Sequence, residues 1–410
     1  MSETTLRRAG DVVGARPAAV VTPALVATVV LVTAVAPMAT DLYVPAFPRV
    51  ADDLGATATQ VQLTLTTFFA GMALGQLAGG PVSDRYGRRG PLLAGLAVMA
   101  FASAVCALTP SIAVMLLARS VQGFAGGWAM VVARAVVVDL AHGTRLVRVL
   151  NVVAAVGGLA PVVAPLLGGA LLQVSGWRAG FWVVAGFGVA IALAAGRTVP
   201  ARAAGRAGRG GTAPTVRQVL RSREYVGYLL VAGAAMGALF AYVATSAFVL
   251  QTMNGLSPMA YSIDFALNAG GMALASFAAA RLAGRVATRT VVLTGLLAAL
   301  AAGLVMLAGA LWLGTPLLVA LGCFFVLMCA VGLVVPNAGA LASAAVPDHP
   351  GSGSAVLGFT MWVAAGGTAP LAGLGGQHTA VPMALLMTLG AVSALTALLA
   401  LTPSTRPSNR

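Results

Sequence analysis

Residues 71–95, GMALGQLAGGPVSDRYGRRGPLLAG, contain the transition that decides the fold. An apolar stretch rich in small residues runs into Asp84, Arg85, Arg88 and Arg89, and a second apolar stretch begins at once. Two apolar runs joined by a short charged turn are the pattern of two membrane-spanning helices that meet at the membrane surface. The stretch therefore predicts an all-α integral membrane protein.

The rest of the chain has the same character. Of its 410 residues, 59% are hydrophobic and only 8% are charged, whereas soluble domains have about 25% charged residues. Apolar runs of about 20 residues, long enough to cross a bilayer as a helix, recur from Val20 to Thr402. Barrel strands are disfavoured because they are alternating segments of only about ten residues. The 50 glycines indicate closely packed helix faces.

We predict twelve spans, and the distribution of arginine sets their orientation. The spans lie at residues 22–46, 58–80, 90–109, 113–140, 147–172, 179–199, 225–250, 258–283, 289–311, 314–344, 353–376 and 380–402. A cytoplasmic N-terminus places 20 of the 24 basic residues, all of them arginine, on the cytoplasmic side. The positive-inside rule therefore predicts that both termini are cytoplasmic. This distribution also accounts for the net charge of +14 without a nucleic-acid partner.

The spans divide into two groups of six, which resemble each other. We expect a cytoplasmic tail at 1–21, a first six-helix bundle at 22–199, a basic cytoplasmic linker at 200–222, a second bundle at 223–402 and a tail at 403–410. Residues 71–95 align without gaps with residues 271–295, with nine identities, and GGLAP at 157–161 matches GGTAP at 366–370. Both matches predict parallel six-helix repeats, which are typical of transporters whose bundles rock about a midplane site.

One segment closely resembles a family signature. Residues 75–89, GQLAGGPVSDRYGRR, are similar to motif A, the loop 2–3 signature of the major facilitator superfamily. The residues that carry this resemblance are Gly75, Gly79, Asp84, Arg85, Gly87, Arg88 and Arg89. We expect the glycines to permit a tight turn and the charged residues to bond helix ends, so that the motif latches one bundle against the other.

Further segments support the resemblance. RSVQG at 119–123 looks like motif B, and residues 157–169 resemble motif C, which this superfamily associates with antiporters. DLYVPAFP at 41–48, VPNA at 335–338 and GSAVLG at 353–358 resemble the Bcr/CflA-type drug:proton antiporters. The motif C-like residues are Gly157, Pro161, Pro165, Gly168 and Gly169. The resemblance implies the fold of this superfamily and the export of drug-like compounds.

The sequence departs from these patterns in two places. Val138 precedes Asp139 where the Bcr/CflA-type subfamily often has an arginine, and Arg134 lies one turn earlier. In the second repeat, Gly284 stands where the first has Asp84, so that the acidic residue of the latch occurs once. The first departure puts an Arg–Asp role at 138–139 in doubt.

Asp41 is the main candidate for proton coupling or substrate binding. It lies in the outer half of span 1 between Pro37 and Pro45. Pro45 has no N–H to donate to the carbonyl of Asp41, which leaves polar backbone beside the carboxyl group. A charged side chain at the centre of a membrane helix costs about 2.5–3.5 kcal/mol, so this carboxyl group is suited to exchanging a proton. A structural ion pair is the alternative.

Other polar and aromatic residues complete the candidate site. We expect Arg119 at a depth similar to that of Asp41, where the two could pair, and Gln122 on the same helix face as Arg119. Tyr43 and Trp128 are candidate substrate contacts near Asp41 and Arg119, although packing is the usual role of such aromatic residues. Asp264, in span 8, is a candidate second carboxylate. The three cysteines and three histidines show no metal spacing, so we expect no metal and no cofactor.

The leading hypothesis is a secondary active transporter in the bacterial inner (plasma) membrane. It would export drug- or antibiotic-like organic compounds in exchange for protons by alternating access, as a monomer that contacts only substrate, protons and lipid. Export of an endogenous metabolite or of a self-made antibiotic is an open alternative. Symport import is disfavoured by the motif C-like run. A membrane enzyme or sensor is disfavoured because the sequence shows no catalytic or nucleotide-binding fingerprint.

Overall fold

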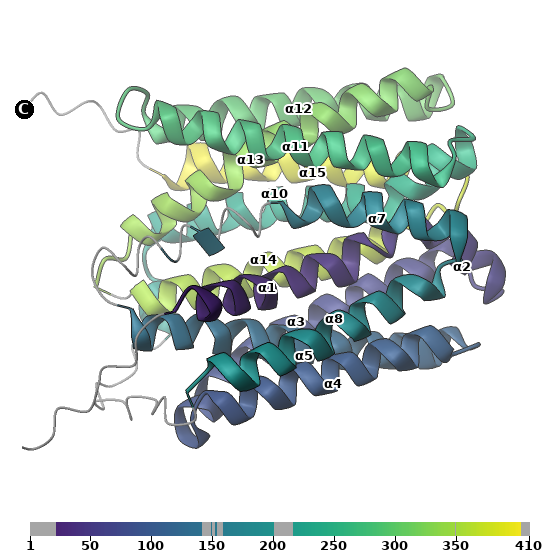
Figure 1. The fold of residues 1–410 in the computed structure, drawn as a ribbon. Helices are drawn as coiled ribbons and strands as arrows, with labels where there is room; N and C mark the ends of the chain where they lie inside the picture. Colours follow the sequence, from purple (N-terminus) through teal and green to yellow (C-terminus); the bar gives the residue numbers. More distant parts are fainter. Residues whose placement is uncertain are drawn as a thin grey trace, which may run out of the picture.

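The structure, a computed structural model, describes residues 22–141, 149, 152–153, 159–200, 216–348 and 350–402. Its regular elements in these ranges are helices, which run along one common direction (Figure 1). Eleven of them, counted over the described residues, are long and apolar enough to cross a membrane. This confirms the predicted helical, multi-pass membrane fold. We call the described residues up to 200 the N half and those from 216 onward the C half.

The helix bounds agree closely with the predicted spans. The N half contains α1 (Pro23–Asp41), η1 (Val44–Ala46), α2 (Phe47–Asp53), α3 (Ala58–Tyr86), α4 (Arg89–Leu108), α5 (Ile112–Leu140), α7 (Ala160–Val174) and α8 (Arg178–Thr198). The C half contains α9 (Val216–Val219), α10 (Arg223–Ala247), η2 (Phe248–Met253), α11 (Pro258–Leu282), α12 (Thr288–Trp312), α13 (Leu317–Ala344), α14 (Pro350–Ala372) and α15 (Val381–Leu401). Helix α7, of 15 residues, lies in the predicted fifth span, most of whose first half falls outside the described residues.

Local sequence signals fix several helix ends. Thr57 and Gln60 form a reciprocal capping box at the start of α3, and the side chain of Ser257 accepts a hydrogen bond from a backbone N–H at the start of α11. These side chains satisfy N–H groups that have no partner within the helix. At the other end of α3, Gly87 has φ 86°, which a glycine adopts without steric cost.

Helix α1 stops at Asp41 rather than continuing to residue 46 as predicted. The backbone N–H of Tyr43 bonds the carbonyl of Thr40, at 3.1 Å, instead of the carbonyl of Ala39. Pro45 has no N–H to offer the carbonyl of Asp41. The chain therefore tightens into the 3₁₀ turn η1, and Asp41 lies at the break.

The two halves are joined mainly at one end of the bundle, which we call the α2 end because it carries α2 and η2; it lies to the right in Figure 1. One large buried apolar cluster contains residues of both halves. A second cluster, which extends from Val219 to Leu398 along the sequence, contains residues of the C half alone and lies toward α9. The shared apolar core thus binds the halves together at the α2 end and at mid-helix.

Candidate functional site

Asp41 lies buried at the break in α1, with 7% of its surface exposed. Its Oδ1 accepts a hydrogen bond of 2.9 Å from the hydroxyl of the neighbouring Thr40. Among the described residues it forms no ion pair. An unpaired carboxylate in such a place is costly, which favours binding of a proton or of another positive charge.

The break at Asp41 packs against the C half, because η1, which begins three residues later, contacts α10 and α11. The charge of Asp41 acts on the phenol groups of Tyr242, on α10, and Tyr261, on α11. Both tyrosines are fully buried. Asp41 therefore lies at the interface between the halves, as its predicted coupling role requires.

Arg119 does not pair with Asp41, and this part of the sequence-based expectation is wrong. Its guanidinium lies inside the N half, where NH1 donates to the carbonyl of Ala39 at 3.0 Å and to Oε1 of Gln122 at 2.6 Å. Ala39 and Asp41 are two residues apart, and each residue rotates a helix by about 100°. The side of α1 that meets Arg119 is thus nearly opposite the side that carries Asp41.

Aromatic rings, rather than a carboxylate, surround the charge of Arg119. The guanidinium carbon lies 4.3 Å from the ring centroid of Phe68, 5.3 Å from that of Tyr43 and 5.8 Å from that of Phe181. Such cation–π contacts are strongest where water is excluded, and Arg119 is completely buried. The NH1 contact supplies a donor to the Ala39 carbonyl that the break in α1 leaves without its usual N–H.

Gln122 extends this network to a neighbouring helix. Its Nε2 donates to the hydroxyl of Ser103, on α4, at 2.7 Å, and that hydroxyl donates to the carbonyl of Met99 at 2.7 Å. Gln122 and Ser103 are fully buried. The predicted proximity of Arg119 and Gln122 is therefore present, but the pair faces the core of the N half.

The candidate second carboxylate, Asp264, belongs to a polar cluster in the C half. Nδ2 of Asn268, one turn later on α11, donates to Oδ2 of Asp264 at 3.0 Å and to the hydroxyl of Tyr242 at 3.1 Å. Nearby on the same helices, the hydroxyls of Ser246 and Tyr261 lie 2.9 Å apart. The helices that carry this cluster, α10 and α11, contact η1 beside Asp41.

Among the described residues, three hydrogen bonds join the halves close to this region. Nε2 of Gln251 donates to the carbonyl of Pro45 at 2.9 Å, and Nε2 of Gln62 donates to the carbonyl of Ala244 at 3.1 Å. The hydroxyl of Thr59 donates to the carbonyl of Gly373 at 2.7 Å. All three are neutral bonds from a side chain to a backbone carbonyl, and they close the α2 end.

The motif C-like residues pack against both sides of the interface. Pro161 begins α7, Pro165 is buried within it, and Gly157 lies outside the described residues. A Cβ on Gly168 would meet the backbone of Leu42, next to Asp41. A Cβ on Gly169 would lie 2.9 Å from Cβ of Ser262, on α11. The glycine pair thus lets α7 approach the break in α1 and the C half at once.

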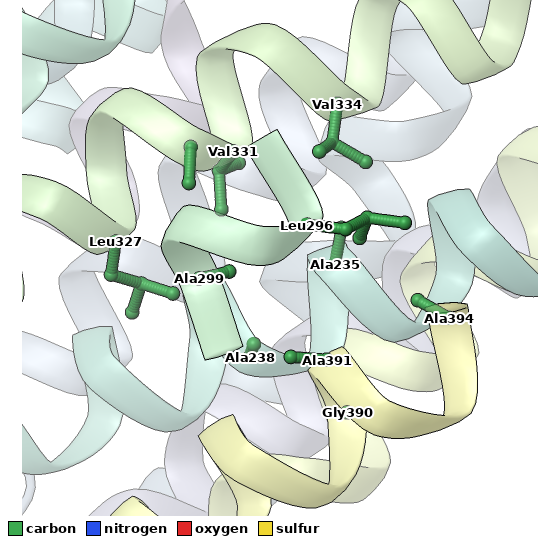
Figure 2. Close-up of a pocket in the computed structure, with 11 residues that line it drawn as sticks. Ala235, Ala238, Leu296, Ala299, Leu327, Val331, Val334, Gly390, Ala391 and Ala394 are labelled. Atoms are coloured by element: carbon green, nitrogen blue, oxygen red, sulfur yellow. The ribbon is translucent and has the colours of Figure 1, made fainter. Parts of the chain in front are cut away.

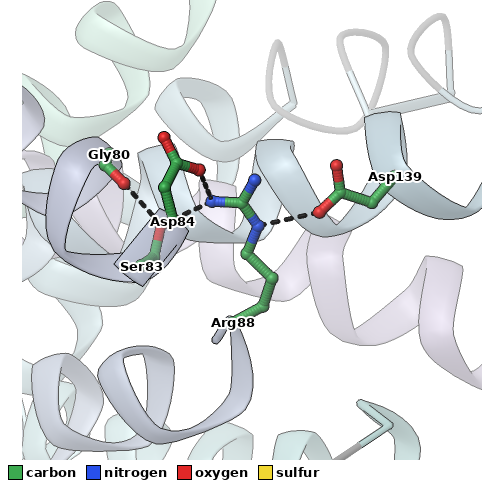
Figure 3. A network of polar contacts seen from close by, with 5 residues as sticks. All are labelled: Gly80, Ser83, Asp84, Arg88 and Asp139. Carbon is green, nitrogen blue, oxygen red and sulfur yellow. Dashed lines mark hydrogen bonds and ion pairs between the residues drawn. The ribbon is translucent and has the colours of Figure 1, made fainter. Parts of the chain in front are cut away.

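The motif A-like charges form a network within the N half (Figure 3). Nε of Arg88 donates to Oδ2 of Asp139, at the end of α5, at 2.8 Å, and NH1 contacts Oδ1 of Asp84 at 2.5 Å and Oγ of Ser83 at 2.7 Å. Burial opposes the charge of Arg88, but hydrogen bonds and charge interactions with Asp139 and Asp84 outweigh this and raise its pKa. These bonds join the α3–α4 turn to α5 within the N half. They do not hold one bundle against the other, as the sequence had led us to expect.

The other motif A-like residues have separate roles. Arg89 donates to the carbonyl of Gly196 on α8, while Arg85 is exposed and lies over the ring of Tyr86. Gly87 makes the expected turn. Gly75 and Gly79 instead lie within α3, where a Cβ would strike the backbone of Phe124 or the side chain of Val131 on α5. The motif therefore packs α3 on α5 as well as forming the turn.

Trp128 does not lie beside Arg119, contrary to expectation. Nine residues of helix separate the two, a rise of about 13 Å. The Trp128 indole donates to the carbonyl of Pro91, at the start of α4, at 2.8 Å. Trp128 thus joins α5 to α4 away from Asp41. The ring of Tyr43 lies against Arg119 rather than Asp41, and its hydroxyl accepts a hydrogen bond of 3.2 Å from the hydroxyl of Thr64.

Two cavities in the described part of the C half contain none of the predicted site residues. One lies among α10, α12, α13 and α15, has a volume of about 10 Å³, and has the lining side chains drawn in Figure 2. Its lining is entirely apolar, which is typical of a dry packing gap. A larger cleft of about 480 Å³ lies among α10, α14 and α15 and is also mainly apolar. The polar interface around Asp41 is therefore the candidate functional site.

Sequence reasoning missed several polar members of this site. Asn268 and Ser246 received no role, although Asn268 follows Asp264 by four residues and so shares its helix face. Gln62 and Gln251 were also overlooked. A polar amide in an otherwise apolar span was the available signal, because such a group needs a partner in the membrane.

Comparison with known proteins now identifies the family. Residues 29–370 match the Major Facilitator Superfamily. The chain belongs to this superfamily. This major facilitator protein is 35% identical, over 87% of its length and 90% of the relative's, to an uncharacterized MFS-type transporter, YdgK, of Bacillus subtilis (strain 168). The family predicted from the sequence motifs is thus confirmed.

Other similar proteins include named resistance proteins and solved transporters. A bicyclomycin resistance protein homolog of Haemophilus influenzae is 29% identical, with 87% of this chain and 89% of the relative covered. Multidrug resistance protein MdtL of Escherichia coli O127:H6 is 29% identical, with 65% and 68% covered. A bacterial homolog of the human lysosomal transporter Spinster has a TM-score of 0.72 at 17% identity, with 91% and 94% covered. This superfamily member is a transporter of small molecules and not an enzyme.

Proposed function

We propose that this transporter exports small, drug-like organic compounds in exchange for protons by alternating access. The names of the Haemophilus and Escherichia relatives, which refer to bicyclomycin resistance and multidrug resistance, support the export of toxic compounds. The motif C-like α7, whose glycines contact both α1 and α11, supports antiport.

One observation carries the proposal: Asp41 is a buried carboxyl group that has no cationic partner among the described residues, and it lies at a break in α1 and at the interface of the halves. A carboxylate there is stabilised by water when the α2 end is open. When the end closes, loss of water makes the charge costly, so the group must take up a proton or meet a positive charge. Protonation of Asp41 would therefore favour closure of the α2 end.

The direction of exchange follows from the proposed orientation. With both termini cytoplasmic, as the arginine distribution predicts, the α2 end faces outward across the bacterial inner membrane. Asp41 would bind a proton from outside, the α2 end would close, and the proton would leave toward the cytoplasm as substrate binds. We propose that a monomer of two six-helix bundles, 22–199 and 223–402, joined by the cytoplasmic linker 200–222, performs this cycle.

A second candidate substrate is a metabolite or antibiotic that the host cell itself produces. The same interface and proton site would serve this reaction. The two cases differ in whether deletion of the gene in its own host causes accumulation of a native compound.

The test is a toxic-compound susceptibility panel, bicyclomycin included, in a pump-deficient bacterial host. Wild type is compared with Asp41→Asn and with Asp52→Asn, an exposed carboxylate at the α2 end, at equal membrane expression. We expect wild type and Asp52→Asn to raise the tolerated concentration of at least one compound and Asp41→Asn to abolish this protection. Protection by Asp41→Asn equal to that of wild type would reject the role of Asp41.

A further inference from the structure

The C half carries its own carboxyl group on α11, a helix that contacts η1 beside Asp41. Asp264 is half-buried on α11, and its recorded partner is the Nδ2 group of Asn268 at 3.0 Å. The same Nδ2 group also donates to the hydroxyl of Tyr242 at 3.1 Å. Asn268, with 1% of its surface exposed, therefore fixes both oxygen acceptors in one place.

The hydroxyl group of Tyr242 has a hydrogen that it could still donate. Its hydroxyl accepts from Asn268, and within the described part of the chain no acceptor is recorded for its own hydrogen. The Tyr242 ring packs between two phenylalanine rings. Its centroid lies 5.6 Å from that of Phe265 and 4.8 Å from that of Phe324. A fully buried O–H without an acceptor is unfavourable, so a carboxyl oxygen that accepted this hydrogen would stabilise the cluster.

Both carboxyl groups act on the same two phenols. Tyr242 and Tyr261 each lie within electrostatic reach of Asp41 from α1 and of Asp264 from α11. The titratable groups that interact with Asp264 are thus these two phenols, while α7 contributes the glycine contact at Gly169. Arg119 is directed away, toward Ala39 and Gln122.

The balance of charge at the closed interface follows from this arrangement. Two carboxylates share the region, and among the described residues neither has a cationic partner. Each carboxylate is costly at a low-dielectric interface without a cationic partner. One proton on Asp41 would leave the charge of Asp264 uncompensated, so that neutralising the interface takes two protons.

We propose that Asp264 is a second proton-binding group, positioned by Asn268, so that each half of the transporter contributes one proton site to the same interface. The inference rests on the proposed proton exchange and deepens it. Each step is the binding of one proton to one carboxylate oxygen, with no other bond made or broken. Asn268 is a positioning residue, because it contacts Asp264 and Tyr242 by hydrogen bonds through its amide alone.

Infrared difference spectroscopy of the purified full-length protein in lipid nanodiscs tests this directly. Spectra at acid and alkaline pH, without substrate, report buried carboxyl groups through the carbonyl stretch of the protonated form. We expect two such signals in wild type, one in Asp41→Asn, one in Asp264→Asn and none in the double variant. Asp348→Asn, an exposed carboxylate of the C half, is the matched control and should keep both signals.

Two more variants keep the test decisive if Asp264→Asn folds poorly. Asp264→Glu keeps a carboxyl group and should shift one signal in frequency, and Asn268→Leu should shift the same signal by removing its hydrogen bond. Spectra of Asp264→Asn or Asp264→Glu that match wild type would overturn the proposal. Because no substrate is used, this result is independent of whether Asp41→Asn abolishes export in the susceptibility panel.

Discussion

The side-chain amide of Gln251 donates a hydrogen bond of 2.9 Å to the backbone carbonyl of Pro45, and it joins the C half to the N half four residues after Asp41. A neutral hydrogen bond of this kind contributes about 1 kcal/mol. Gln251→Leu should therefore shift the equilibrium toward opening of the α2 end by roughly fivefold. Spin labels at positions 52 and 374, both exposed at this end, measure the shift as a larger population of long distances.

Asn254→Leu is a suitable comparison for Gln251→Leu. The Asn254 amide bonds the carbonyls of Val249 and Thr315, both in its own half. Its loss should leave the distances between the halves unchanged. Equal distance distributions in wild type and Gln251→Leu would show that this bond does not hold the α2 end closed.

Gly169→Ala should weaken the contact between α7 and α11. The new Cβ would lie 2.9 Å from Cβ of Ser262, closer than side-chain carbons approach, so one helix must move. Gly270→Ala, where nothing lies within 4 Å, should instead raise stability by about 0.5–1 kcal/mol, because alanine is the better helix former. Thermal unfolding in detergent should show opposite signs, and parallel changes would contradict the contact.

Arg88 and Arg85 are three residues apart but should differ sharply on substitution. Arg88→Leu leaves Asp139, which is mostly buried, without its partner, and breaking such a pair costs about 3 kcal/mol. Arg85→Leu removes an exposed charge and should cost less than about 1 kcal/mol. The unfolding temperatures of the two purified variants measure this difference. Equal losses of stability would mean that the network in Figure 3 contributes little to the stability of the fold.

Arg119→Lys should be poorly tolerated although it keeps the charge. Lysine lacks the planar group that lies 4.3 Å from the Phe68 ring while donating to Ala39 and Gln122, and such sites do not accept the exchange. Arg134→Lys, on the exposed surface of the same helix, is the control. The readout is the amount of folded protein that elutes as a single peak from a sizing column, which should fall for Arg119→Lys only.

Helix positions were predictable because the membrane leaves few alternatives. An apolar run bounded by arginine or a capping residue can only be a span, and α3, for example, begins at residue 58 as expected. The end of α1 was harder. Pro45 indicated loosened backbone near Asp41, but the sequence did not show that the helix would stop there and tighten into η1.

Side-chain partners were less predictable than helices. Arg119 and Asp41 share a depth, and depth alone suggested an ion pair, whereas their directions depend on how α5 and α1 are rotated. Asp84 and Arg88 pair at a spacing of four residues, which the sequence shows, but the bond from Arg88 to Asp139 on α5 depends on how the helices pack. Helix rotation and packing, which no local pattern encodes, decided the partners of Arg119 and the second partner of Arg88.

The bonds that close the α2 end place little constraint on the evolution of the two halves. In each, one half supplies an amide or hydroxyl and the other supplies only a main-chain carbonyl. Every residue carries such a carbonyl, so mutations on the accepting side leave the bond in place. Each half can therefore drift in sequence, and adapt its surfaces to new compounds, without a matching change in the other.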